Sequence, residues 1–106
     1  MTSMKDRQDG FERKFAHDEE TRFKATARRN KLLGLWVAGE IGKTGDAAEA
    51  YAREVVKSDF EEAGDEDVFR KVRADLEAAG STHSEHQIRR RMDELMAEAI
   101  QQITSA

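Results

Sequence analysis

The sequence predicts an all-α protein, a four-helix bundle with a flexible N-terminal segment. Apolar residues recur at steps of three and four in four successive segments, which is the pattern of helices with one buried stripe. Glycines stand between these segments, at positions typical of helix ends. The chain contains no proline that would interrupt a long helix. No segment alternates long enough to indicate a strand.

The first predicted helix covers roughly residues 18–42 and is the longest. Residues 32–38 are apolar nearly all round, so we expect this helix to be the most buried and to lie centrally. Within it, Leu32, Leu33 and Trp36 are interpreted as core residues and not as part of a cofactor site. The second predicted helix begins at Asp46 as N-cap and ends at Gly64. Its apolar positions are Ala48, Tyr51, Ala52, Val55, Val56 and Phe60.

The third predicted helix extends from Asp65 as N-cap to Gly80. Pairs at i, i+4 on its outer face, Glu66–Arg70 and Asp67–Lys71, are expected to stabilise a solvated surface. Its expected core positions are Val68, Phe69, Val72, Leu76 and Ala79.

The fourth predicted helix begins with a capping box, formed either by Ser84 with Gln87 or by Thr82 with Glu85. Its apolar stripe consists of Ile88, Met92, Leu95, Met96, Ala99, Ile100 and Ile103. Short connections predict that consecutive helices are mostly antiparallel neighbours.

Composition and charge narrow the possible classes of protein. The 106 residues fit one domain, and the chain has no cysteine for a disulfide, a thiol nucleophile or a thiolate zinc site. Residues 1–31 carry a net charge of +3, whereas residues 32–82 carry −6. A basic head on an acidic body argues against binding nucleic acid and favours contact with an acidic protein surface. No stretch predicts a signal peptide or membrane insertion, so we expect a cytoplasmic protein.

The N-terminal part of the chain differs from the rest. We predict a mobile segment at residues 1–17 and the bundle domain at 18–106. Phe11 and Phe15 lie four residues apart among charged residues and form a weak amphipathic patch. Such a short segment does not hold a helix in water by itself, which favours folding on a partner.

Several short motifs are weak indications of chemistry. Gly42-Lys43-Thr44 resembles the end of a phosphate-binding loop, but it lacks the earlier glycine and the preceding strand; a glycine helix end is the better interpretation. His83 and His86 have a metal-compatible spacing without an evident third ligand, so a surface pair is favoured. His17 is a possible pH-sensitive hinge, although an ordinary exposed histidine is favoured.

The basic runs, residues 28–29 and 89–91, point in several directions on a helix and predict no broad patch. No catalytic constellation emerges among the 22 acidic residues, so the chain is predicted not to be an enzyme. The alternative of a module that senses adenine nucleotide (ATP or ADP) through Arg28, Arg29 or Lys43 stays open. So does a helical adaptor with another protein target.

Two long stretches carry a family resemblance. They are FKATARRNKLLGLW at residues 23–36 and DFEEAGDEDVFRKV at residues 59–72. Both resemble the alphaproteobacterial zeta subunit, the inhibitor of the F-type ATP synthase, and the similarity extends over nearly the whole chain, including KFAHD at residues 14–18.

This resemblance implies a four-helix bundle whose N-terminal segment enters the catalytic head, formed by the alpha, beta and gamma subunits, and blocks ATP hydrolysis. It also implies a protein that is peripheral to the inner membrane through the ATP synthase, a monomer without its partner, and no cofactor. The segment that matches the family's inhibitory region is roughly residues 1–15. Gly10 is a departure within it, because glycine weakens any helix formed there. The residues expected to bind the partner are Met4, Lys5, Arg7, Phe11, Arg13, Lys14 and Phe15.

Overall fold

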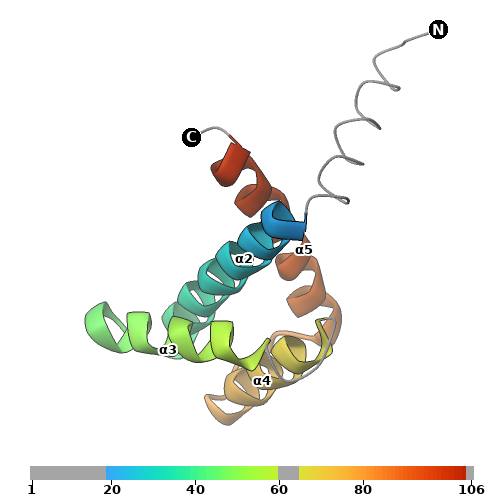
Figure 1. Ribbon diagram of the computed structural model, residues 1–106. Helices are drawn as coiled ribbons and strands as arrows, with labels where there is room; N and C mark the ends of the chain where they lie inside the picture. The colour runs from blue at the N-terminus through green and yellow to red at the C-terminus, as the bar shows by residue number, and fades with distance from the viewer. Residues whose placement is uncertain (1–18, 60–64, 105–106) are drawn as a thin grey trace, which may run out of the picture.

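The structure is a computed structural model that describes residues 19–59 and 65–104. These described residues form four α-helices, which are α2 (Glu19–Glu40), α3 (Gly45–Ser58), α4 (Glu66–Ala78) and α5 (Glu85–Thr104) (Figure 1). The predicted all-α fold of four helices is therefore confirmed. The predictions for His17, Phe60 and Gly64 fall outside the described residues.

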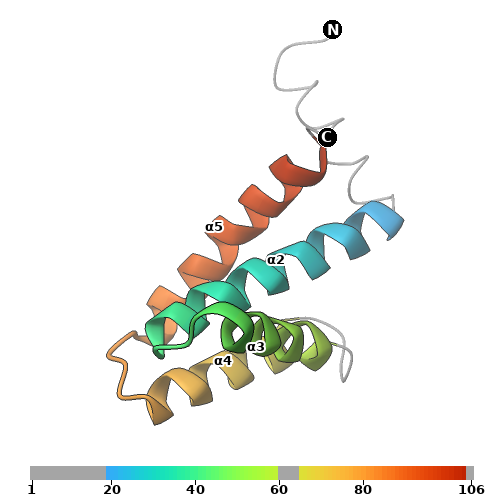
Figure 2. The same cartoon turned by 90° about the vertical axis from the view of Figure 1, so that its left-hand side faces the viewer.

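Helix α2 is central, as its apolar run predicts. It lies between α5 on one side and α3 with α4 on the other (Figure 2), and it contacts all three. Within the described ranges, α3 and α5 do not contact each other. The buried stripe of α2 therefore holds the two sides of the bundle together.

The core is formed by the stripes that the periodicity predicts. Leu33 and Val37 of α2, Val55 of α3 and Val72 of α4 are fully buried. From α5, Ile88, Met92, Leu95 and Ala99 complete the core. Leu32 and Trp36 are only partly buried and pack against this core, at its edge.

The ends of three helices follow elementary capping rules. Ser84 and Gln87 form the predicted capping box: the Gln87 N–H donates to Ser84 Oγ at 3.1 Å, and the Ser84 N–H donates to Gln87 Oε1 at 2.8 Å. Gly42 and Gly80 have φ angles of +84° and +82°, the left-handed conformation that ends a helix. The following N–H of Lys43 bonds to the Ala38 carbonyl at 2.8 Å. The interpretation of residues 42–44 as a helix end is therefore correct.

The predicted start of α3 at Asp46 is wrong by two residues. Thr44 is the N-cap, since its carbonyl accepts the N–H of Ala48 at 3.4 Å, and Asp46 lies in the first turn. The reason is Gly45, whose φ of +55° is accessible to glycine and allows the helix to begin two residues earlier than predicted. Helix α3 then ends at Ser58, before the predicted end at Gly64.

Two predictions for α4 are also wrong. Ala79 is the exposed C-cap and not a core residue. Lys71 does not pair with Asp67: its ammonium contacts Glu54 at 3.3 Å and Asp75 at 3.2 Å, while Asp67 pairs with Arg70. The cause is the neighbouring helix α3, which offers Lys71 a partner that helical spacing within α4 does not reveal.

Glu66, the other acidic residue of the predicted pairs, bonds to Arg89 of α5 at 3.1 Å. Lys71 thus has one partner on α3 and one on its own helix, whereas Glu66 has a partner on α5. Across the described residues, none of the helices is long and apolar enough to cross a membrane.

Candidate functional site

All seven residues that were predicted to bind a partner lie outside the described residues: Met4, Lys5, Arg7, Phe11, Arg13, Lys14 and Phe15. The candidate contact surfaces that the structure does describe are therefore on the four helices. Three features of these helices involve polar or aromatic side chains. They are the buried Arg29, the pocket at Trp36 and the surface between α4 and α5.

Arg29 is buried to 2% exposure in the middle of α2, next to Asn30 at 1%. Its Nε donates to Asn30 Oδ1 and one terminal nitrogen donates to Asp65 Oδ1, both at 2.7 Å. Asp65 is the N-cap of α4, so this charged pair fixes the start of α4 against α2. A buried guanidinium needs such partners because an unpaired buried charge is costly. Its role is therefore structural.

The carboxyl of Asp59, at the C-terminal end of α3, faces the same cluster. Burial raises the pKa of Asp59, whereas hydrogen bonding by the Asn30 side chain and the positive charge of Arg29 lower it. The nearby carboxylates of Asp65 and Asp67 raise this pKa further. The charge of Arg29 thus acts on two carboxylates, Asp59 and Asp65, at the two ends of the connection between α3 and α4.

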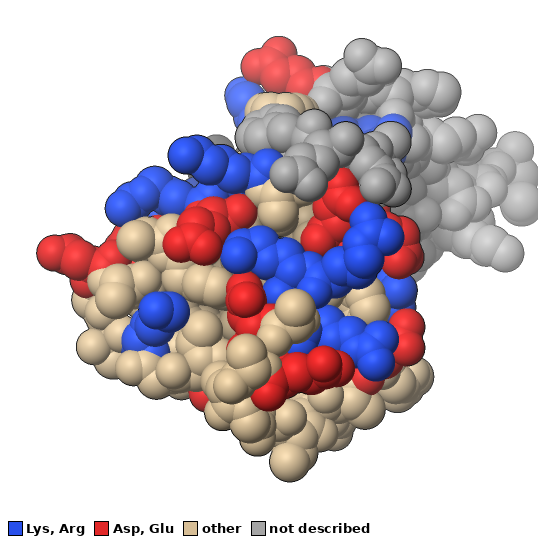
Figure 3. All heavy atoms as spheres, turned by 90° about the horizontal axis from the view of Figure 1, so that it is seen from below, with Lys and Arg blue, Asp and Glu red and all other residues tan. Residues whose placement is uncertain are grey.

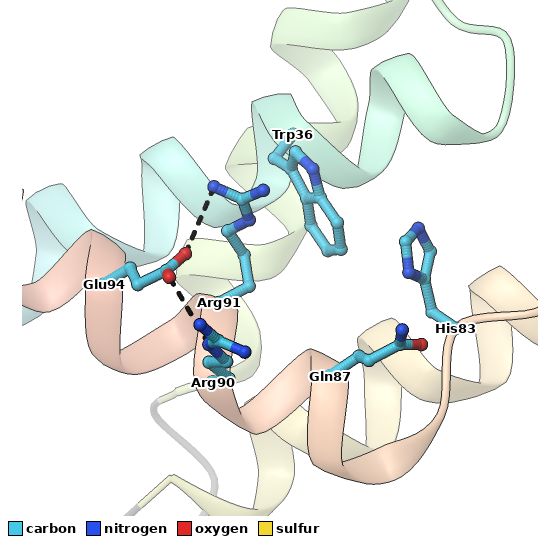
Figure 4. A pocket seen from close by; sticks show the side chains of 6 residues that line it. All are labelled: Trp36, His83, Gln87, Arg90, Arg91 and Glu94. Carbon is cyan, nitrogen blue, oxygen red and sulfur yellow. Dashed lines mark ion pairs between the residues drawn. The ribbon is translucent and has the colours of Figure 1, made fainter.

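A small pocket with a volume of about 220 Å³ lies between α2 and the beginning of α5 (Figure 4). The Arg91 guanidinium lies 5.2 Å from the centre of the Trp36 ring. The ring of His83, which belongs to the loop before α5, has its centre 5.1 Å from the centre of the Trp36 ring. His83 Nε2 also contacts the Glu40 carboxylate at the end of α2. The remaining lining residues are Gln87, Arg90 and Glu94.

The two arginines of this pocket share the one carboxylate among its lining residues. Glu94 pairs with Arg91 at 3.3 Å and with Arg90 at 3.7 Å, as the dashed lines of Figure 4 show. Cation–π and aromatic contacts hold the start of α5 on α2. The six lining residues include no nucleophile with an adjacent base, and the contacts among them are packing and ion-pair contacts.

The basic run at residues 89–91 divides as helical geometry predicts. Arg89 lies 3.9 Å from the centre of the Phe69 ring and pairs with Glu66, Arg90 pairs with Glu94, and Arg91 covers Trp36. Figure 3 shows acidic and basic side chains interleaved over the face seen there. The described surface on this side is thus a mixed ionic surface that does not suit a polyanion.

The residues considered for nucleotide binding do not lie together. Arg29 is buried against Asp65, Arg28 is exposed near the N-terminal half of α2, and Lys43 follows the other end of that helix. Likewise, no group of three or more His, Asp or Glu side chains within the described ranges is placed to hold a metal ion. His83 contacts Glu40 and Trp36, whereas His86 is exposed in the first turn of α5.

Sequence reasoning missed the pocket at Trp36 and the buried Arg29 pair. Arg28 and Arg29 are identical neighbours in the sequence, yet one is exposed and the other is buried. A signal was present for Arg29: it lies four residues before Leu33 and therefore on the same buried stripe. Nothing in the sequence pointed to its partner Asp65.

These features define a class: a small all-α protein with interleaved acidic and basic side chains on its surface. Comparison with known proteins gives the family. The family model described as ATPase inhibitor subunit zeta matches residues 1–102, and the chain belongs to this family. The resemblance that the sequence analysis identified is thereby confirmed, and the family is one of regulatory subunits and not of enzymes.

A solved structure supports the fold. The chain is similar to a protein whose solution structure was determined by NMR, with 56% sequence identity and a TM-score of 0.71. The similarity covers 79% of this chain and 95% of that chain. The search of curated proteins finds no match.

Proposed function

We propose that this chain binds the catalytic head of the F-type ATP synthase and inhibits ATP hydrolysis through its N-terminal segment, residues 1–15. One observation best supports the assignment of inhibition to the N-terminal segment. The family match begins at residue 1, whereas the buried core of the described helices lies between Ala25 and Ala99. The family thus includes a segment that precedes the core in sequence.

The chemistry of that segment suits groove binding. Phe11 and Phe15 are spaced one helical turn apart, so both contact the same wall of a groove once the segment is helical. Arg7, Arg13 and Lys14 orient the segment toward acidic groups of the head. Met4 and Lys5 extend the contact. The proposed partners are the alpha, beta and gamma subunits.

The bundle, residues 18–106, acts as an anchor in this proposal. Ordering the segment costs roughly 1–2 kcal/mol per residue of backbone, and this offsets much of the gain from burying the two phenylalanines. Contacts of the bundle, or its effect of holding the segment close to its groove, supply the remaining affinity. The protein is then a monomer without its partner. It is cytoplasmic and associates with the inner membrane only through the ATP synthase.

The deciding experiment is steady-state ATP hydrolysis by the purified ATP synthase with the full chain or with a chain lacking residues 1–15. We expect the deletion to abolish inhibition at saturating concentration. Far-ultraviolet circular dichroism serves as the control, because the deletion lies outside the described core and leaves its helices intact. Equal inhibition by both chains would contradict the proposal and place the inhibitory surface on the helices.

A helical adaptor with another protein target is the competing class. Co-purification separates the two: an inhibitor subunit is recovered with the ATP synthase from detergent-solubilised membranes, and an adaptor of another complex is not.

A further inference from the structure

A groove of about 530 Å³ crosses the N-terminal half of α2 where α3 and α5 approach it. Its floor and walls are apolar: Phe23 and Ala27 come from α2, Val56 from α3 and Ile103 from α5. Phe23 is the large hydrophobic side chain that stands out among the described residues, with 60% of its surface exposed. An exposed aromatic at the mouth of an apolar groove is typical of an interaction site.

Three cations follow one side of this groove. Lys24, Arg28 and Lys31 recur at helical spacing and all line it. Lys24 pairs with Glu20 at 3.2 Å. Arg28 and Lys31 are exposed, and neither forms an ion pair with any residue in the ranges 19–59 and 65–104. Elsewhere on α4 and α5 the described arginines have acidic partners, so this edge carries uncompensated positive charge.

We propose that this groove binds an acidic amphipathic helix of the catalytic head, as a second contact beside residues 1–15. This rests on the function proposed above. The apolar floor suits the apolar face of a helix, and Lys24, Arg28 and Lys31 suit acidic side chains along the edge of that face. At 1.5 Å per residue, Phe23 and Lys31 lie roughly 12 Å apart along α2, a length that accommodates about two turns of a docked helix.

The position of the groove also favours this occupant. Helix α2 begins at Glu19, four residues after the end of the proposed inhibitory segment at Phe15, and the groove begins four residues later at Phe23. A subunit that binds the segment therefore lies next to the groove. A second copy of this chain, through its acidic residues 32–82, and an anionic membrane are competing occupants that the experiment separates.

The test uses the full chain with one charge reversed. Arg28→Glu and Lys31→Glu alter the edge of the groove, and Lys43→Glu is the matched control because Lys43 is exposed at the opposite end of α2. The measurement is the concentration that gives half-maximal inhibition of ATP hydrolysis by the purified catalytic head. We expect each groove variant to raise it roughly tenfold, mainly through slower association, and the control to leave it within about twofold.

A further variant, Phe23→Ala, tests the apolar part of the contact. We expect a similar loss of affinity, without the reduced dependence on salt that the charge reversals produce. Maximal inhibition at saturation stays unchanged in all these variants, because the segment at residues 1–15 is intact. The substituted side chains, those of Phe23, Arg28, Lys31 and Lys43, are all exposed, so we expect the melting temperatures to be unchanged. If one of the three groove variants unfolds, the potency of the other two still tests whether the groove is a contact.

Three results would overturn the proposal. The first is equal potency of the Arg28→Glu, Lys31→Glu and Phe23→Ala variants and the Lys43→Glu control. The second is a dimer of the unmodified chain in sedimentation that Arg28→Glu dissociates. The third is binding to vesicles of phosphatidylglycerol that Arg28→Glu abolishes, with the affinity for the head unchanged.

Different results would contradict the proposal for the groove and the proposal for the segment. If deletion of residues 1–15 abolishes inhibition while Arg28→Glu matches its control, the segment is the inhibitor and the groove is not a contact. If the deletion has no effect while Arg28→Glu weakens binding, the groove is a contact and the inhibitory role of the segment is wrong.

Discussion

The backbones of α2 and α3 meet at Gly34 and Ala52. A Cβ atom placed on Gly34 would lie 2.6 Å from the Ala52 Cα and 3.1 Å from its Cβ. It would also lie 3.3 Å from the Val55 Cβ. The contact at 2.6 Å is shorter than any that a side chain tolerates against backbone, so the missing side chain of Gly34 sets the distance between the two helices.

Replacing Gly34 by alanine is therefore expected to destabilise the fold. Forcing one methyl group into a packed helix interface costs typically about 1–3 kcal/mol. Gly39→Ala is the matched control in the same helix, since a Cβ at Gly39 meets no atom within 4 Å. That variant should be as stable as the original chain or more stable by up to about 1 kcal/mol, because alanine favours helix. Urea unfolding measures both; equal stability of the two variants would contradict the close approach.

Leu33 and Trp36 have different places in the core, although the sequence suggests equal roles. Leu33 is fully buried, whereas Trp36 is partly exposed at the pocket with Arg91 and His83. Leu33→Ala should lower the free energy of unfolding by about 2–5 kcal/mol, as is usual for a buried leucine. Trp36→Ala should cost less. Calorimetric melting of both variants tests this order, and a larger loss for Trp36→Ala would reverse it.

Asp65 compensates the buried charge of Arg29. In Asp65→Ala the guanidinium loses this partner but remains buried, which is more costly than the loss of a surface pair. Because the Asp65 side chain is 51% exposed, water takes over part of its role, and we expect a loss of about 1–3 kcal/mol.

The exposed pair of Lys24 with Glu20 provides the control for Asp65→Ala. Glu20→Ala should change stability by less than about 0.5 kcal/mol, the range of an exposed pair at i, i+4. Denaturant unfolding of both variants at low and high salt tests the comparison. If Asp65→Ala matches Glu20→Ala at both salt concentrations, the pair at Arg29 does not stabilise the fold.

The environment of Tyr51 predicts that the free energy of unfolding depends on pH in the alkaline range. Burial raises the pKa of the Tyr51 hydroxyl, and its 2.7 Å hydrogen bond to Asp75 and the charges of Asp75 and Glu54 raise it further. An unfolded tyrosine ionises near pH 10. The folded state thus favours the protonated form, so this contribution to stability is complete below about pH 10 and is lost as the pH rises above it.

The chain contains one tyrosine, which makes the test direct. Tyrosinate absorbance should appear only as the protein unfolds, and the free energy of unfolding should fall by up to about 1.4 kcal/mol per pH unit above pH 10 from this group. Tyr51→Phe removes this part of the slope while the lysines still contribute theirs. Ionisation of Tyr51 near pH 10 in the folded protein would show that the hydroxyl is not buried as described.

The helices and their buried stripes were predictable because burial repeats with the helical period. Ile88, Met92 and Leu95 lie where the spacing predicted, and the Ser84 capping box was visible because both of its residues lie within one turn. Local geometry determines such features. The start of α3 was missed because the conformation of Gly45 is not determined by residue type alone.

Partners across helices were not predictable. Arg29 and Asp65 are 36 residues apart, and Tyr51 and Asp75 are 24 apart. Periodicity indicates which face of a helix is buried but not which residue of another helix lies opposite. The groove at Phe23 depends on the placement of three helices, so no pattern along the sequence indicates it.

The proposed inhibitory segment, residues 1–15, gives a further prediction. Phe11 and Phe15 are its only aromatic residues, and burying each of them gains about 1.5–3 kcal/mol before the cost of ordering. Apolar anchors usually dominate the affinity of a docked amphipathic segment. The double variant Phe11→Ala with Phe15→Ala should therefore cause most of the loss of inhibition that deletion of residues 1–15 causes.

Charge reversal at Arg13 and Lys14 should act differently. In the proposed function these residues guide the approach to an acidic surface, so their reversal should mainly slow association and leave dissociation of the bound complex nearly unchanged. The time course of inhibition after mixing with the purified ATP synthase separates the two rates. If the double alanine variant inhibits as strongly as the unmodified chain, the phenylalanines are not anchors. The affinity of the segment would then have to come from its charges, and high salt would abolish inhibition by that variant.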